Sequence, residues 1–146
     1  MIKHPRKWKR IPYDSMNSRQ QEIFNFQKIS GLLSDFGFSA SWVKDDWNHT
    51  DFLAVPFDGS EVFRVQLKGR PYFFAHSSKN LWVCYIARKT KNVYFYDHDR
   101  LLALAKTRGI TKTEEWQTRH SYSYPNTPQW LTKALKPYLL GRLDSI

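Results

Sequence analysis

Five short segments between residues 38 and 97 alternate in side-chain character with a period of two residues, and no other feature limits the possible folds as strongly. They are rich in aromatic and β-branched residues, and they read FSASWVK, DFLAVPF, EVFRVQLKG, LWVCYIAR and NVYFYD. This pattern predicts β-strands, because successive side chains of a strand point to opposite faces of a sheet. An Asp-Gly pair at residues 58–59 separates the second segment from the third and favours a hairpin between them.

Helical periodicity precedes these strands. We expect a helix from Ser18 to about Phe36, with Ser18 as its N-cap and Gly37 as the residue that stops it. Its apolar side chains recur at helical spacing and form one stripe, which faces the core of a folded protein. The stripe consists of Phe26, Ile29, Leu33 and Phe36.

Helical periodicity resumes after the strands. The segment DHDRLLALAKT, residues 97–107, predicts a second helix that Asp97 or Asp99 caps. A loop at about 120–128 precedes a last helix, PQWLTKALKPYLL, which Pro137 kinks or ends. Helices on both sides of a strand-rich region predict a single α+β domain over residues 1–146, with a mixed or antiparallel central sheet flanked by helices.

Polar residues interrupt the apolar pattern at three places. On the third strand Phe63, Val65 and Leu67 share one face, while Arg64, Gln66 and Lys68 share the other. Asp51 opens the second strand, and Glu22 lies within the apolar stripe of the first helix. Burying such groups costs several kcal/mol unless each finds a partner. A divalent cation would offset this cost, because Mg²⁺ binds carboxylate, amide and carbonyl oxygens.

The spacing of these residues carries a family resemblance. Asp51, then fourteen residues, then Gln66-Leu67-Lys68 resembles the signature of the PD-(D/E)XK nuclease superfamily, in the variant with Gln in place of the middle acid. Mrr-like restriction endonucleases and some homing endonucleases have this variant. Longer stretches, including NSRQQEIFNFQKISGLLSDFGF and YFYDHDRLL, resemble bacterial restriction-endonuclease-like proteins over roughly residues 1–105. The first helix of the family often supplies a glutamate, which Glu22 matches.

The resemblance implies a restriction-endonuclease-like fold and a nuclease that uses Mg²⁺ or Mn²⁺ to cut DNA. It implies that Asp51, Gln66, the carbonyl of Leu67 and, more weakly, Glu22 are metal ligands, and that Lys68 lies near the attacking water. Two departures leave a non-catalytic nucleic-acid-binding module open: Thr50 stands where proline is common, and Gln66 replaces an acid. A purely structural alternative has Lys68 reaching solvent at the sheet end and Gln66 bonded to nearby backbone.

The charge of the chain favours a polyanionic partner. Twenty-three Lys and Arg residues oppose thirteen Asp and Glu residues, which gives a formal net charge of +10. Such a surface suits nucleic acid, because contacts to phosphates release counterions. A basic protein-interaction domain that binds no nucleic acid is the remaining alternative. The candidate nucleic-acid contacts are Lys7 and Trp8 in a basic N-terminal arm (1–17), together with Arg19, Arg64 and Arg70.

The remaining expectations concern location and assembly. No run of about 18 apolar residues exists to span a bilayer, and we expect a cytoplasmic protein. Cys84 is the only cysteine, so no internal disulfide is possible. A two-fold dimer would be the easiest way to cut both strands of a duplex. Asp45 and Asp46 are expected in a solvated turn, and His98 in the capping region of the second helix.

Overall fold

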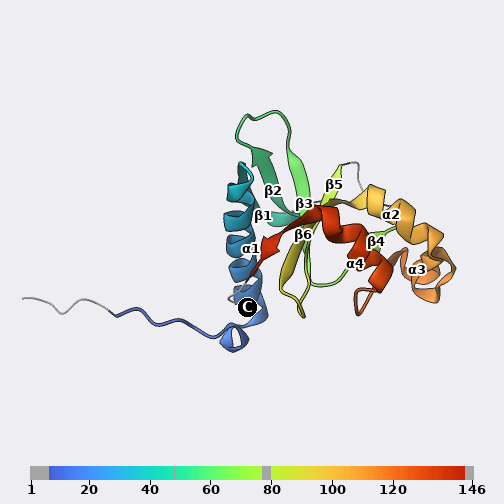
Figure 1. The fold of residues 1–146 in the computed structure, drawn as a ribbon, viewed down its shortest axis with the longest axis horizontal. Coiled ribbons are helices and arrows are strands. Elements are labelled where there is room, and N and C mark those ends of the chain that lie inside the picture. The colour runs from blue at the N-terminus through green and yellow to red at the C-terminus, as the bar shows by residue number, and fades with distance from the viewer. Residues whose placement is uncertain (1–6, 48, 77–79, 144–146) are drawn as a thin grey trace, which may run out of the picture.

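The computed structural model describes residues 7–47, 49–76 and 80–143, and within them a six-stranded mixed sheet forms the centre of the molecule (Figure 1). The strand order is β1-β2-β3-β5-β6-β8, and neighbouring strands are antiparallel except β3 and β5, which are parallel. The bounds are β1 Phe38–Trp47, β2 Thr50–Pro56, β3 Phe63–Lys68, β5 Leu81–Ile86, β6 Asn92–Asp97 and β8 Leu139–Arg142. Strands β4 (Tyr72–Phe74) and β7 (Ser121–Ser123) form a separate two-stranded sheet.

Helices flank the central sheet on both sides, so the α+β prediction is confirmed. Helix α1 lies along one side, and α2, α3 and α4 lie with the small sheet on the other (Figure 1). The bounds are α1 Ser18–Asp35, α2 His98–Thr107, α3 Glu114–Arg119 and α4 Gln129–Leu135. Within the described ranges no helix is long and apolar enough to cross a membrane.

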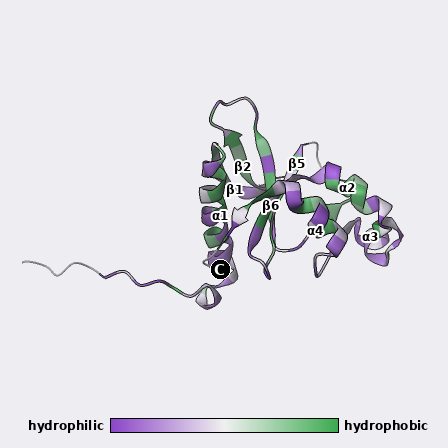
Figure 2. Ribbon diagram, viewed as in Figure 1, coloured by the Kyte–Doolittle hydropathy of each residue, from purple (hydrophilic) through white to green (hydrophobic). Residues whose placement is uncertain are grey.

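The sheet separates two apolar clusters, which we call the α1-side core and the α2-side core. Because side chains alternate along each strand, adjacent residues contribute to different clusters. The α1-side core contains Ile29, Leu33, Phe52, Ala54, Val65, Cys84, Ile86, Val93, Phe95 and Leu143. The α2-side core contains Phe73, Val83, Tyr85, Tyr94, Tyr96, Leu101, Leu102, Ala105, Ile110, Leu131 and Leu135. Hydrophobic residues accordingly follow the strands and the inner sides of the helices (Figure 2).

Helix α1 begins at Ser18, and its N-cap lies one residue earlier than predicted. Asn17, not Ser18, is the N-cap, and it forms a capping box with Gln20 in which each side chain accepts a hydrogen bond from the other residue's backbone N–H. Gly37 stops the helix as predicted, because its φ of 79° is the left-handed conformation that glycine adopts without strain. Phe36 is 55% exposed, so its place in the buried stripe was wrong.

The first three strands follow the predicted order with shifted ends. The hairpin between β2 and β3 is confirmed, and Phe52 pairs with Val65 within it. Strand β1 continues through Asp45 and Asp46, so their expected turn was wrong. The register of β1 against β2 is irregular between Trp42 and Trp47. This irregularity lets β1 extend through a polar stretch that alternation alone would end.

The C-terminal region departs most from prediction. Helix α4 ends at Leu135, and a 3₁₀ turn from Lys136 to Tyr138 contains Pro137, so proline ends the helix as one of the two expected outcomes. The residues after it form β8 beside β6, which corrects the predicted helix over 128–140. Asp97 is the N-cap of α2, as predicted, and accepts a hydrogen bond from the Asp99 N–H.

The described part of the N-terminal arm has two parts. Residues 7–12 contain neither helix nor strand and extend away from the body (Figure 1). Tyr13, in a 3₁₀ turn, packs its ring against Phe24 at 5.5 Å and accepts a hydrogen bond from Asn25 Nδ2 at 2.9 Å. The C-terminal end of the arm is therefore anchored to α1. Residues 1–6 lie outside the described ranges.

Candidate functional site

The hairpin of β2 and β3 brings Asp51 and Gln66 together. Phe52 pairs with Val65, and continuing this register by one residue sets Asp51 opposite Gln66. Phe52 and Val65 belong to the α1-side core, so the side chains of Asp51 and Gln66 leave the sheet on the opposite face. The predicted carboxylate and amide therefore lie beside each other on one face.

The backbone of β3 holds the carboxylate of Asp51. Asp51 Oδ2 accepts a hydrogen bond from the Leu67 N–H at 2.8 Å. The N–H and C=O of one strand residue point to the same neighbouring strand. The carbonyl of Leu67 is therefore directed toward the side of β3 on which Asp51 lies, as its expected role as a backbone ligand requires.

Gln66 contributes an oxygen that lacks a partner. The residue is 8% exposed, and its Oε1 atom is buried without a hydrogen-bond partner in the described part of the chain. A buried acceptor left in this state costs about 1–3 kcal/mol. The amide oxygen therefore lacks the backbone partner that the purely structural alternative would give it. A cation that accepts electron density from Oε1 would remove the cost.

Lys68 lies on the same face as Gln66 and is half-buried. Its Nζ atom lies over the ring of Tyr72 at 4.3 Å and over that of Phe74 at 5.7 Å. Burial lowers the pKa of Lys68, and the negative charge of Asp51 acts in the opposite direction. The effect of Asp51 on this pKa means that the ammonium is close enough to interact with the carboxylate electrostatically. The lowered pKa means that the amine loses its proton more easily than an exposed lysine does.

Glu22 has a different environment. Helix α1 packs against the face of the sheet opposite to Gln66 and Lys68, and the Glu22 carboxylate forms an ion pair with Arg19 Nη1 at 3.5 Å. Arg19 also lies 5.9 Å from the ring of Trp42. Both predicted residues thus interact on the surface of α1. The supporting role of Glu22 and the nucleic-acid contact of Arg19 stay predictions.

The other predicted nucleic-acid contacts fall into two groups. Arg64 shares the face of β3 with Gln66 and Lys68, and Arg70 is exposed just beyond the end of that strand. Lys7 and Trp8 lie in the extended arm, where Trp8 is 84% exposed. The structure therefore brings Arg64 and Arg70 near the candidate ligands and leaves Lys7 and Trp8 on a separate segment.

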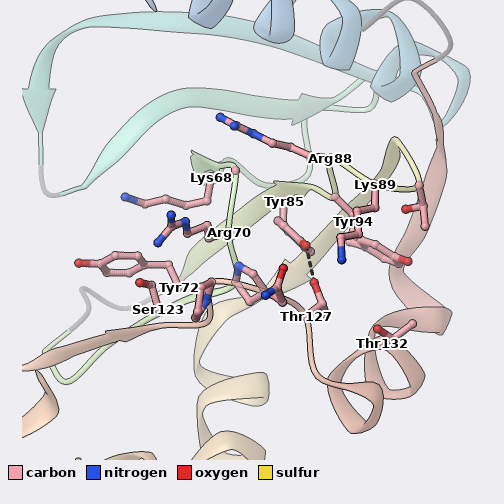
Figure 3. Close-up of a pocket in the computed structure, with 16 residues that line it drawn as sticks. Lys68, Arg70, Tyr72, Tyr85, Arg88, Lys89, Tyr94, Ser123, Thr127 and Thr132 are labelled. Carbon is pink, nitrogen blue, oxygen red and sulfur yellow. Dashed lines mark hydrogen bonds between the residues drawn. The ribbon is translucent and has the colours of Figure 1, made fainter. Parts of the chain in front are cut away.

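A cleft of about 740 Å³ adjoins Lys68 (Figure 3). Lys68 and Arg70 lie at one end with Tyr72, and Lys89 and Tyr94 lie at the other. The basic pair Arg88-Lys89 on this cleft was not predicted from the sequence. Its one signal was the position of the pair at the end of a predicted strand. That signal pointed to no site because the parallel pairing of β3 and β5 was not predicted.

His98 is a structural residue at the start of α2 that links this helix to β4. It is fully buried, its Nε2 accepts a hydrogen bond from the Phe74 N–H at 3.0 Å, and its Nδ1 lies 2.9 Å from Asp99 Oδ1. Because Nε2 is the acceptor, the proton of the neutral ring sits on Nδ1 and is donated to Asp99. Burial lowers the pKa of His98, more than the hydrogen bond and charge of Asp99 raise it. His49 stacks on the ring of Phe74 at 4.5 Å.

The donor set of the site is unusual. The described residues contain no group of three or more His, Cys, Asp and Glu side chains able to hold a metal ion. A cation here would depend on one carboxylate with amide and carbonyl oxygens, which are hard donors suited to Mg²⁺ or Mn²⁺.

Comparison of the chain with protein-family models, with curated proteins and with solved structures gives no match. The functional assignment therefore depends on the residues of the site itself.

Proposed function

We propose that this protein is a divalent-metal-dependent nuclease of restriction-endonuclease-like fold that hydrolyses phosphodiester bonds of DNA. One observation carries the proposal: the buried, unpartnered Oε1 of Gln66 shares a face with the carboxylate of Asp51 and the ammonium of Lys68. An unpartnered buried oxygen costs stability, and a cation bound to it beside the carboxylate would remove that cost.

The residues of the site have different roles in binding the cation. Asp51 supplies the only full negative charge of the donor set, and the Leu67 N–H fixes its orientation. The oxygens of Gln66 and Leu67 would hold the cation together with this carboxylate, and water or a phosphate would provide its remaining ligands. The bound cation would supply Lewis-acid stabilisation of the negative charge that develops on the phosphoryl oxygens.

Lys68 acts on the attacking water and on the negative charge that develops on the phosphoryl group. Its lowered pKa allows the amine to take a proton from an attacking water, and its protonated form stabilises a negatively charged phosphoryl group. The rings of Tyr72 and Phe74 hold the ammonium by cation–π contact, which limits the positions that Nζ can take. Arg64 and Arg70 extend the positive surface on which a neighbouring phosphate would bind.

A second candidate function is a non-catalytic nucleic-acid-binding module on the same fold. Gln66 in the place of an acid favours it, because an amide oxygen binds a cation less strongly than a carboxylate. This module would retain the basic surface and bind DNA with a steep dependence on salt. It would differ from the nuclease in binding no divalent cation even when DNA is present.

Incubation with supercoiled plasmid and each divalent metal in turn tests the proposal. The wild type should nick or linearise the plasmid with Mg²⁺ or Mn²⁺, and Asp51→Ala should abolish this cleavage. Asp35→Ala, at the exposed C-terminal end of α1, is the matched control and should cleave like the wild type. Equal cleavage by Asp51→Ala would overturn the assignment, whereas DNA binding without cleavage under any metal would favour the module.

A further inference from the structure

The cleft beside Lys68 is lined by several cations. Lys68, Arg70, Arg88 and Lys89 contribute to it, and no Asp or Glu is among the described residues that line it. In a chain with thirteen acidic residues, their exclusion from a concave surface favours an anionic occupant. A cleft with low-dielectric walls concentrates such a positive field further.

The parallel pairing of β3 and β5 brings these cations together. Lys68 pairs with Tyr85, so the residues that follow both strands leave the sheet at the same edge. Arg88 Nε lies 4.0 Å from the position that a Cβ atom on Gly69 would occupy, which places its guanidinium over the turn between Lys68 and Arg70. The fold therefore gathers cations from two separate segments of the chain around one entrance.

A second hollow continues the first. It has a volume of about 680 Å³, shares Tyr94 and Thr132 with the cleft, and adds Lys133, Lys136 and Trp130. Its described lining also contains no acidic residue. We call the two hollows together the basic groove. One of these hollows would be enough to bind a mononucleotide. A groove with cations in both hollows suits a polymer with regularly spaced phosphates.

Aromatic side chains accompany the cations along the basic groove. Tyr72 at the Lys68 end and Trp130 in the second hollow are partly exposed, whereas Tyr85 and Tyr94 are buried and form the floor of the groove between them. The hydroxyl groups of Tyr85 and Thr127 share a hydrogen bond that joins β5 to the loop before α4 (Figure 3). Cations interleaved with aromatic rings suit a strand whose bases are unpaired, because phosphates contact the cations while bases stack on rings.

We propose that the basic groove binds the unpaired strand of a nucleic-acid substrate and delivers it to Lys68. This inference rests on the proposed nuclease function and names its substrate as single-stranded or locally unpaired nucleic acid. Each hollow has the size of a small-molecule pocket, which admits nucleotides one after another. A duplex fits poorly, because its bases are already stacked on each other and offer no free face to Tyr72 and Trp130.

Binding measured without divalent metal tests the groove independently of hydrolysis. Fluorescence anisotropy in a chelating buffer compares fluorescein-labelled oligothymidine, oligouridine and a duplex, using the full chain. The cleft variant is Arg88→Ala/Lys89→Ala, and the matched control is Lys106→Ala/Lys112→Ala, which removes two cations outside both hollows. Circular dichroism melting verifies that both variants are folded.

We expect the wild type to bind a single strand of either kind more tightly than the duplex. The cleft variant should bind a single strand about tenfold or more weakly, and its salt slope should fall by about 0.7 for each phosphate that no longer meets a cation. Equal weakening by the control variant, or tighter binding of the duplex, would overturn the inference. Plasmid cleavage tests the nuclease function separately, because failure there leaves the metal-free binding result unchanged.

Discussion

The two faces of the β2–β3 hairpin differ completely although they alternate along the same strands. On the α1 side, Phe52 and Val65 are fully buried in an apolar core. On the other side, Asp51, Gln66 and Lys68 form a polar group in which one oxygen is left unpartnered. A fold whose net stability is only about 5–15 kcal/mol tolerates this cost where function requires it. Substitutions on the first face should therefore act on stability, and those on the second should act on chemistry.

Lys68→Met should have the largest effect on the polar face. The variant keeps the stem of the side chain and removes the ammonium, so we expect a loss of cleavage of about 10²- to 10⁴-fold, the range of a proton-transfer group. The melting temperature should change little, because the substitution removes a charge whose partial burial is itself unfavourable. Rates measured on plasmid with Mg²⁺ provide the test, and Lys106→Met on α2 is the control. Retained cleavage in Lys68→Met would contradict a chemical role for this face.

Phe52→Ala examines the opposite face. Deleting a fully buried phenyl ring should lower the free energy of unfolding by about 3–5 kcal/mol. Phe57→Ala, at a ring that is 72% exposed, should change it by less than about 0.5 kcal/mol. Urea unfolding followed by fluorescence measures both. Similar values for the two variants would show that the α1-side core does not depend on Phe52 as described.

Gln66→Met separates stability from function at one residue. Methionine has a similar volume and leaves no unsatisfied oxygen, so we expect a gain of about 1 kcal/mol in unfolding free energy together with loss of metal-dependent cleavage. Gln27→Met, at an exposed position of α1, is the control for the substitution itself. A destabilised Gln66→Met protein would mean that the amide is needed for packing.

A pH effect distinguishes the α2 side, where His98 is buried. Burial lowers the pKa of His98 in the folded protein, so the unfolded chain binds more protons as the pH falls below about 6.5. The stabilisation from neutral His98 is therefore complete above that pH and is lost progressively on acidification toward the lowered folded value. Melting between about pH 7.5 and 5 should show a smaller decline in His98→Asn than in the wild type. His120→Asn, at an exposed histidine, should decline like the wild type.

Local features of the fold were predictable from sequence, whereas long-range pairing was not. Gly37 ended α1 as expected because left-handed backbone is a property of the residue itself. Strands β4 and β7 have three residues each and no repeated alternation, so only their pairing with each other defines them. The segment Leu139–Arg142 continues an apolar helical pattern, and its pairing with β6 overrides that local preference.

The same limit applies to the site. Alternation on a strand was enough to predict that Gln66 and Lys68 share a face, and the Asp-Gly hairpin predicted that the strand of Asp51 lies beside theirs. Among the cations of the basic groove, Lys68 and Arg70 were predicted as site residues. Arg88 and Lys133 were not, because they reach the groove through parallel pairing and the packing of α4, which sequence spacing does not encode. In a mixed sheet, the loops that come together in space are determined by the pairing of distant strands.

Electron paramagnetic resonance of Mn²⁺, which counts the free ion, tests the central claim most directly. A titration with an oligonucleotide present compares the wild type with Asp51→Asn, Gln66→Met and Gln66→Glu. We predict that the wild type binds Mn²⁺, that the first two variants lose this binding, and that Gln66→Glu binds more tightly because a carboxylate replaces the amide. Wild type that leaves all Mn²⁺ free, or equal binding in all four proteins, would contradict a metal site between Asp51 and Gln66.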